Sequence, residues 1–369
     1  MIYMNNAATS FPKPDCVGEA MLKAVNSPPS ESLRGGFGTF DVFAQARREL
    51  SLLLHAENPS RIALGCNATW ALNTAIFGLD LKPGDTVVST KAEHNSVLRP
   101  LCALRKQGVQ VILVNTDQQG RADLQQWEAA IRQYRPQLAV LTHATNVTGA
   151  VNDPIKFSKS AREVNCIFLL DCSQTIGCIP INTEEFQADM VAFTGHKYLL
   201  GPQGTGGLWV REGLNLKPYL MGGTGIQSDL QEMPESMPIH LEAGTGNEPS
   251  YYGLLAALQW QRENPPDRFE LYQKTEFLSK KLQDAGALVI NPPGQRTPVV
   301  SCTLPGISAS EAGYLLSESC EIACRTGLHC APRIFECLKV SETVRLSLSR
   351  FTQYKEIEAV IQAVEAILS

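Results

Sequence analysis

Short apolar runs alternate with longer amphipathic segments between residues 60 and 210, and this alternation constrains the fold of the chain more than any other feature. The apolar runs are rich in Val, Ile and Leu and are bounded by Gly, Pro or polar residues, as buried strands are. We expect strands at residues 61–65, 86–89, 110–114, 138–142, 167–171, 190–194 and 207–210. Candidate helices lie between them at 69–78, 97–107, 124–134 and 155–164. This pattern predicts an α/β protein whose mostly parallel, seven-stranded sheet is covered by helices on both faces.

The pattern changes after residue 210, and the chain of 369 residues is long for one compact core. Residues 211–250 are rich in Gly, Pro, Met and Gln, which is typical of a long functional or interface loop. Helices are expected at 251–263 and 269–285, followed by strands at 299–304 and 343–348 and a last helix at 355–368. We therefore predict a large domain at 16–250, and a linking helix with a smaller C-terminal α/β domain at 251–369. Residues 1–15 are expected to pack on the small domain.

Charge and cysteine usage exclude several classes of protein. The 32 basic and 37 acidic residues give a net charge of −5, and no basic block is present, so no nucleic-acid partner is expected. No window approaches 18 uninterrupted apolar residues, so no membrane span is expected. The first residues contain neither a basic region nor a long apolar run, and the 11 cysteines include no C-x-x-C pair. We expect a cytoplasmic protein in which most cysteines pack as small hydrophobic side chains.

Two ionisable residues follow neighbouring strands at the sheet edge where open parallel sheets bind ligands. Asp171 ends an apolar run, where a carboxylate either caps a helix, pairs with a cation or binds a ligand. Lys197 follows the next predicted strand, residues 190–194, from which Gly195 and His196 separate it. A glycine-rich stretch comes shortly after it. A lone lysine is usually solvated. A lysine held by glycines in a cleft is instead partly desolvated, which lowers its pKa and suits it to form a Schiff base.

Pyridoxal 5'-phosphate is the cofactor that needs these groups together, since it requires a lysine for covalent attachment and a carboxylate for its pyridinium. Thr69, at the expected start of a helix, offers a hydroxyl and backbone N–H groups to the phosphate. Thr194 and His196 add further donors. His94 is the candidate for stacking on the ring, although a histidine taken alone is more often a helix cap or a core residue.

Several segments, weak alone, form a specific ordered set. They are Asn6-Ala7-Ala8-Thr9-Ser10, Glu93-His94, Asn146 with Thr148-Gly149, Asp171 to Gln174, Thr194-Gly195-His196-Lys197, Glu242-Ala243-Gly244-Thr245, Arg325-Thr326-Gly327-Leu328-His329-Cys330-Ala331 and Val344-Arg345-Leu346-Ser347. The set resembles the class V aminotransferase family of fold-type I pyridoxal-phosphate enzymes, specifically the cysteine desulfurase/selenocysteine lyase group. The resemblance covers nearly the whole chain.

The resemblance implies roles for the matching residues at the cofactor. Lys197 would carry the cofactor, Asp171 would pair with its pyridine nitrogen, Gln174 would bind its ring hydroxyl and His94 would stack on the ring. Thr245 would reach the phosphate of the neighbouring subunit, which implies a homodimer with shared sites. The full set implied for cofactor binding is Ala68, Thr69, His94, Asn146, Asp171, Gln174, Thr194, His196, Lys197 and Thr245.

The resemblance also implies the substrate site and the nucleophile. Asn146, Arg325 and Arg345 would bind the substrate, with the Arg345 fork on the α-carboxylate; a surface arginine at a strand end is the alternative for Arg345. Cys330 would accept sulfur, giving L-alanine from L-cysteine, with L-selenocysteine as a second substrate. The segment around Cys330 resembles the group II (SufS-like) pattern, with a short ordered loop, so a docked acceptor protein or a reductant would receive the sulfur. Lys197, Cys330 and His94 would be the catalytic residues.

The residues themselves support a reactive Cys330, because Arg325 and His329 bring positive charge near a thiol and favour the thiolate. Inert burial is the alternative for any single cysteine. Gly327 and Pro332 favour a shaped loop over a regular strand.

The chain departs from the family pattern at three places. Asn5 stands where the family usually has Asp, Ala68-Thr69-Trp70 replaces Thr-Thr-Glu at the phosphate, and Phe351-Thr352 replaces Tyr-Asn. Substrate choice is therefore the inference that the resemblance supports least.

Two other functions stay open. Another class V activity, an aminotransferase or a C–S β-lyase, would need Lys197 and Asp171 but not Cys330. A metal- or cluster-binding interaction protein would use Cys320, Cys324, Cys330 and Cys337, but their spacings match no common zinc site, and we expect no metal.

Overall fold

The computed structural model describes residues 1–28 and 40–369. Its central sheet has seven strands in the described ranges, in the order β2-β8-β7-β6-β5-β3-β4. Strand β8 runs antiparallel to both of its neighbours, and the other pairs are parallel. The mostly parallel seven-stranded sheet is confirmed. The strands are β2 (Ile62–Gly65), β3 (Thr86–Thr90), β4 (Gln110–Val114), β5 (Leu138–Thr142), β6 (Ile167–Asp171), β7 (Met190–Thr194) and β8 (Gly206–Val210).

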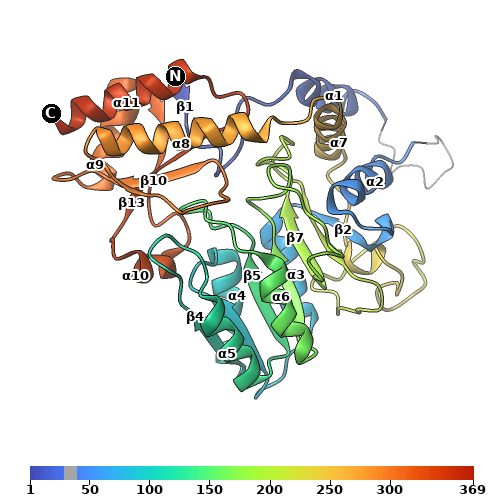
Figure 1. Ribbon diagram of the computed structural model, residues 1–369. Helices are drawn as coiled ribbons and strands as arrows, with labels where there is room; N and C mark the ends of the chain where they lie inside the picture. Colours follow the sequence, from blue (N-terminus) through green and yellow to red (C-terminus); the bar gives the residue numbers. More distant parts are fainter. Residues whose placement is uncertain (29–39) are drawn as a thin grey trace.

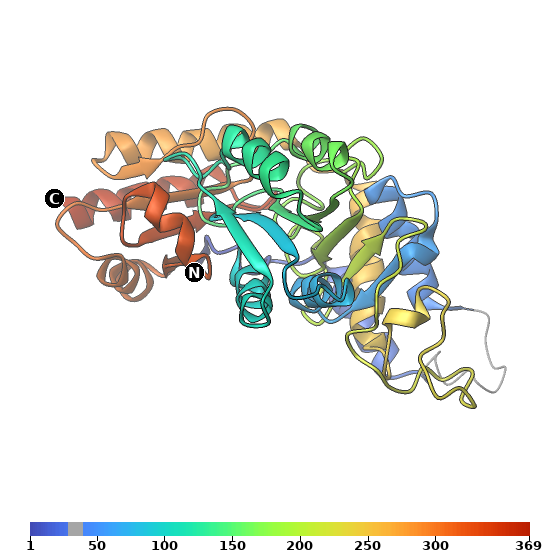
Figure 2. The ribbon, with the colours of Figure 1, turned by 90° about the horizontal axis from the view of Figure 1, so that it is seen from below.

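Helices cover both faces of this sheet, and the alternation of side chains along each strand explains why (Figures 1 and 2). In β6, Phe168 and Leu170 pack on one face and Leu169 packs on the other, and all three are fully buried. The first face is covered by α2 (Val42–Leu54), α5 (Leu124–Tyr134), α6 (Pro154–Glu163) and α7 (Glu248–Glu263). The second face is covered by α3 (Ala68–Gly78) and α4 (Asn95–Lys106).

The C-terminal part of the chain forms a second hydrophobic core. Its sheet has the order β12-β13-β10-β9, with β9 (Leu288–Ile290), β10 (Val299–Thr303), β12 (Arg325–Gly327) and β13 (Thr343–Ser347). Helices α8 (Arg268–Asp284), α9 (Ala309–Cys320) and α11 (Tyr354–Leu368) pack against it (Figure 1). The short helix α10 (Phe335–Leu338) lies between this sheet and the large sheet. The exact domain boundaries stay predictions.

The N-terminal segment connects the two cores. Strand β1 (Ile2–Tyr3) pairs in parallel with β11 (Ile322–Ala323), and Met4 is buried in the C-terminal core. Helix α1 (Asp15–Val25) then packs against α7. Residues 211–247 form the long irregular segment expected there, with a short 3-10 helix at Ile239–Leu241. None of the helices within residues 1–28 and 40–369 combines the length and the apolar character needed to cross a membrane.

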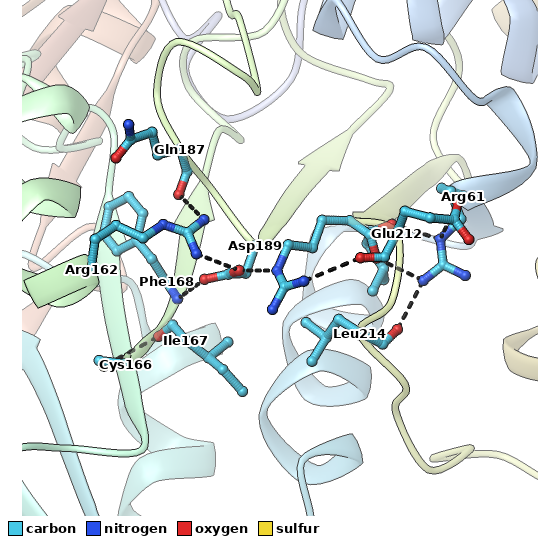
Figure 3. A network of polar contacts seen from close by, with 11 residues as sticks. Arg61, Arg162, Cys166, Ile167, Phe168, Gln187, Asp189, Glu212 and Leu214 are labelled. Atoms are coloured by element: carbon cyan, nitrogen blue, oxygen red, sulfur yellow. Dashed lines mark hydrogen bonds and ion pairs between the residues drawn. The ribbon is translucent and has the colours of Figure 1, made fainter. Parts of the chain in front are cut away.

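A buried carboxylate anchors the end of the sheet opposite the polar edge described below (Figure 3). Asp189, just before β7, is 1% exposed and contacts both Arg162 and Arg211. Its second oxygen accepts a hydrogen bond from the backbone N–H of Phe168 at 2.7 Å. Arg162 in turn donates to the backbone carbonyl of Gln187 at 2.7 Å. One side chain thereby joins the starts of β6 and β7 to the ends of α6 and β8.

We expect Asp189→Asn to lower the free energy of unfolding by about 2–4 kcal/mol, because two arginines lose their shared counter-ion. This loss is smaller than for a fully buried ion pair, because both arginine side chains are about 40% exposed and water partly screens their charges. Urea unfolding measures the change. Glu128→Gln, which breaks an exposed ion pair with Arg132, is the control and should alter stability by less than about 0.5 kcal/mol. Equal effects of the two substitutions would contradict the anchoring role.

Candidate active site

A polar cavity lies at the carboxyl ends of the parallel strands, where β5, β6 and β7 meet the N-terminal end of α3. The C-terminal sheet closes it from the other side through Arg325 and Arg345. The structure brings most of the expected site residues together here: the lining includes Ala68, Thr69, His94, Asn146, Asp171, Gln174, Thr194, His196, Lys197, Arg325 and Arg345.

Lys197 enters the cavity from the turn after β7. Gly195 makes this turn possible, because a Cβ at that position would lie 2.1 Å from Thr205 Oγ1. The turn is held by the N-terminal segment, since Ser10 N and Thr9 Oγ1 donate to the His196 carbonyl at 3.0 and 3.1 Å. Burial lowers the pKa of Lys197 to about 8, and Arg345 acts in the same direction. The amine is therefore far easier to deprotonate than a surface lysine.

Asp171 lies at the end of β6, next to Lys197. Its Oδ1 accepts hydrogen bonds from the backbone N–H of Ser173 at 2.9 Å and from the Ser173 hydroxyl. Burial raises the pKa of Asp171, while Ser173 and Lys197 act against this rise. The carboxylate thus stabilises the turn that follows β6 and also lines the cavity, where its binding of a ligand stays a prediction.

The N-terminal end of α3 forms another wall. Asn67 caps the helix, its Oδ1 accepting from Trp70 N at 2.9 Å. Thr69 Oγ1 lies 2.7 Å from Ser96 Oγ, which lies 2.9 Å from His94 Nδ1. Unpaired backbone N–H groups at a helix start, together with hydroxyls, are suited to an anion.

His94 both caps α4 and lines the cavity. Its Nδ1 accepts from the backbone N–H of Ser96 at 3.1 Å, so the proton of the neutral ring resides on Nε2. Burial lowers the pKa of His94 to about 4, and the charges of Lys197 and Arg325 act in the same direction. The capping alternative is therefore correct for His94, and it places a neutral, flat ring at the cavity.

Arg345 is fully buried, so the alternative of a surface arginine is wrong. Its Nη1 donates to the Asn146 carbonyl at 2.8 Å and its Nη2 to Asn5 Oδ1 at 3.3 Å, while Nε has no hydrogen-bond partner in the described part of the chain. Among the described residues no carboxylate pairs with this guanidinium within 4.0 Å. A buried, unpaired guanidinium at a cavity wall is suited to bind a carboxylate ligand.

Cys330 lies beside the cavity in a tight turn. The sequence predicts a shaped loop around Cys330. This is wrong for Arg325–Gly327, which form strand β12. It is correct for His329 and Cys330, whose φ angles of 50° and 59° lie in the left-handed region. Asn95 N donates to the Cys330 carbonyl at 2.7 Å, which ties the turn to α4. Arg325 Nη2 lies 3.1 Å from Cys330 Sγ, so a guanidinium is placed directly against the sulfur.

The other cysteines near Cys330 in the sequence have different surroundings. Cys320 and Cys324 pack against the C-terminal core, whereas Cys337 Sγ lies 3.9 Å from Asn115 Oδ1. Residues 1–28 and 40–369 contain no group of three or more His, Cys, Asp or Glu side chains positioned to hold a metal ion.

Comparison with known proteins places the chain in a family. A family model described as Aminotransferase class-V matches residues 2–360. The chain belongs to the class V aminotransferase family. Over its whole length this class V protein is 29% identical to a probable cysteine desulfurase from Pyrococcus abyssi, of which it covers 94%. It is 27% identical to a cysteine desulfurase from Haloferax volcanii, over 99% of this chain and 89% of that protein.

Solved structures agree with this assignment. The fold matches the apo structure of a cysteine desulfurase from Thermococcus onnurineus with a TM-score of 0.89 and 25% identity, covering 100% of this chain and 94% of that one. A cysteine desulfurase from Escherichia coli gives a TM-score of 0.87, also at 25% identity and with the same coverage. The class V protein therefore has the fold-type I architecture.

Thr245 is the expected cofactor residue that lies outside the cavity of its own chain. It is exposed and lines a separate surface groove with Arg47 and Glu242. Glu242 accepts from Arg47 Nη2 at 2.6 Å and from Leu64 N at 2.6 Å, which fixes the segment before Thr245.

Sequence reasoning gave no role in the site to several residues in or beside the cavity. Ser96 and Ser173 orient His94 and Asp171, and each lies two residues after its partner, a spacing that local Asx- and cap-type bonds favour. Ala7 and Asn5 reach the site only because the N-terminal segment folds across it, which no local pattern indicates.

Proposed function

We propose that this protein is a pyridoxal-phosphate-dependent cysteine desulfurase, which converts L-cysteine to L-alanine and leaves the sulfur as a persulfide on Cys330. The observation that carries this proposal is a cavity shared by Lys197, Asp171 and an unpaired, buried Arg345, with Cys330 held against Arg325 beside it. The relatives named cysteine desulfurase support the same activity.

The cavity residues fit the cofactor of the family. Among the residues that the structure describes, Gln174 Oε1 and His196 Nδ1 are buried and have no hydrogen-bond partner, so both atoms can bind a ligand at this wall. We propose that Asp171 pairs with the pyridine nitrogen, that Gln174 and Asn146 lie at the ring hydroxyl, and that His94 stacks on the ring. The phosphate would be held by the start of α3 and by the side chains of Thr69, Thr194 and His196.

Trp70 stands where the family usually has Glu in the phosphate motif, and this difference has a structural explanation. The Trp70 ring packs over Gly65, where any Cβ would lie 2.0 Å from the ring. Position 70 therefore fills space beneath the start of α3 instead of contributing a polar group. Backbone N–H groups of Ala68 and Thr69 would take over part of the phosphate binding.

When bound, the cofactor supplies a carbonyl carbon that captures the substrate amine and a ring that accepts electrons released at Cα. Arg345 binds the α-carboxylate and fixes the orientation of the substrate. Lys197, neutral once it is free, removes the Cα proton. Asp171 keeps the ring nitrogen protonated and so favours the build-up of electrons there.

Cys330 performs the sulfur transfer. Its thiolate attacks the sulfur of the substrate, an S–S bond forms, and the Cβ–S bond breaks with its electron pair passing to carbon. Protonation of that carbon, together with return of the proton from Lys197 to Cα, yields alanine, and the persulfide remains next to Arg325. We assign proton transfer to His94, which lines the cavity, rather than to His329, whose Nε2 is bound to Thr343 Oγ1 at 2.8 Å and which is 2% exposed.

The proposal includes L-selenocysteine as a second substrate, since it differs from L-cysteine by one atom. It also includes a cytoplasmic location, transfer of sulfur to an acceptor protein or reductant, and a homodimer in which Thr245 completes the partner's phosphate site. Exposed apolar side chains in the same irregular segment support such an interface: Tyr219, Leu220, Met221, Ile226 and Leu230.

The test is production of L-alanine from L-cysteine by the purified holoenzyme, with L-selenocysteine and L-cystine compared in parallel. Stoichiometric alanine and a persulfide on the protein are expected. Formation of pyruvate or of a transamination product instead of alanine would assign the chain to the β-lyase or aminotransferase alternative.

We expect cofactor capture by the apoprotein to depend on pH through Lys197. The neutral amine reacts, so the rate should rise with pH, reach half its maximum near pH 8 and level off above it. Because the charge of Arg345 helps to lower this pKa, Arg345→Met should move the midpoint to higher pH. A capture rate that keeps rising towards the ordinary lysine pKa of 10.5 would contradict a buried Lys197.

A further inference from the structure

The partners of Arg345 are all neutral. Nη1 donates to a backbone carbonyl, Nη2 donates to the side-chain amide of Asn5, and Nε has no partner. The side chain is 0% exposed, so water does not compensate its charge. A buried guanidinium in such surroundings is costly to the folded protein unless an anion arrives from outside.

The backbone, rather than the contact with Arg345, places Asn5 in this position. Asn5 forms an isolated parallel bridge with Ser347, two residues beyond Arg345 in β13. Ser347 N donates to the Met4 carbonyl at 2.7 Å, and Ala8 N donates to the Asn5 carbonyl at 3.0 Å. Side-chain substitutions at position 5 therefore keep these backbone bonds.

No carboxylate within residues 1–28 and 40–369 serves as a counter-ion to Arg345. Burial and the neighbouring Arg325 lower the pKa of Arg345 to about 10, and the groups that act against this are Tyr198, Cys330 and Tyr3, none of them a carboxyl group. An aspartate at position 5 would have the shape of Asn5 but would pair with Nη2 as an ion. Asn5 thus orients the guanidinium without neutralising it.

We infer that Asn5 determines the affinity of the cavity for carboxylate ligands, because its neutral amide leaves the full charge of Arg345 to the ligand. This inference rests on the proposed function, in which that ligand is the α-carboxylate of an amino acid. A side chain that never touches the substrate would then set how strongly the substrate is bound.

The test compares wild type, Asn5→Asp and Asn5→Ala by titration calorimetry of the holoenzyme with L-alanine, which carries the carboxylate but no thiol. L-Alaninamide, which lacks the carboxylate, is the control ligand. We expect Asn5→Asp to weaken L-alanine binding by about tenfold to a hundredfold, and Asn5→Ala, which keeps the site neutral, by less than about fivefold. L-Alaninamide binding should be the same in Asn5→Asp and wild type. The melting temperature of the ligand-free Asn5→Asp variant should not fall, since its buried arginine gains a partner.

Unchanged L-alanine affinity in Asn5→Asp, or an equal loss for L-alanine and L-alaninamide, would overturn the inference. Because the measurement is equilibrium binding, it is independent of turnover. A protein that binds L-alanine in this Asn5-dependent way but produces no alanine from L-cysteine would refute the proposed function and support the inference. A protein that produces alanine while Asn5→Asp binds normally would refute the inference alone.

Discussion

Lys197→Ala is expected to lower alanine production from L-cysteine by at least about a thousandfold, because the variant loses both the covalent attachment point of the cofactor and the base for the Cα proton. The visible absorption of the lysine-bound cofactor should disappear in the same variant. The fold should be retained, since Lys197 makes no ion pair among the described residues and Gly195, rather than the lysine, shapes its turn. Alanine assays, absorption spectra and circular dichroism measure the three effects.

Lys217→Ala provides the matched control, because Lys217 is largely exposed and pairs with Asp80 at the surface. It should leave activity and spectrum unchanged. An intact absorption band in Lys197→Ala would show that another amine carries the cofactor. Such a result would remove the basis of the proposed mechanism, whatever the activity.

Much of the fold follows from the sequence because a buried parallel sheet leaves a strong local pattern. The strands β4, β5, β6 and β7 begin and end at the predicted residues, since each is an apolar run that polar or turn-forming residues terminate. Helices α1, α2 and α9 were not predicted. Helix α9 has only three buried residues, Ala309, Ala312 and Leu316, so its apolar face is too narrow to stand out.

The candidate site was predictable where residues lie at or just after the ends of neighbouring strands, as Asp171 does at the end of β6 and Lys197 does after β7. The surroundings of Arg345 were not predictable from local patterns, because Asn5 and Arg345 are 340 positions apart. Their contact depends on the N-terminal segment pairing with β13. The tertiary path of that segment, not any propensity, brings the first residues of the chain to the cavity.

Both hydrophobic cores contribute residues to the one cavity. The large sheet presents Lys197 and Asp171, whereas Arg325 and Arg345 are direct partners on β12 and β13 of the smaller sheet. Asn95 N fixes the Cys330 turn to α4 of the large domain. The proposed nucleophile is therefore positioned by both parts of the chain, which suits the proposed step, in which its sulfur must meet a substrate held by Lys197 and Arg345.

Cys330→Ala should decrease alanine production from L-cysteine by at least about a hundredfold while leaving substrate binding intact, because the thiolate acts only after the substrate is bound. The loss is expected in kcat, with little change in the affinity for L-alanine. Cys66→Ala is the matched control, since Cys66 is exposed and lies outside the cavity, and it should keep full activity. Full activity of Cys330→Ala would place the chain among class V enzymes that do not use this cysteine, whereas a loss that Cys66→Ala does not share would assign the sulfur transfer to Cys330.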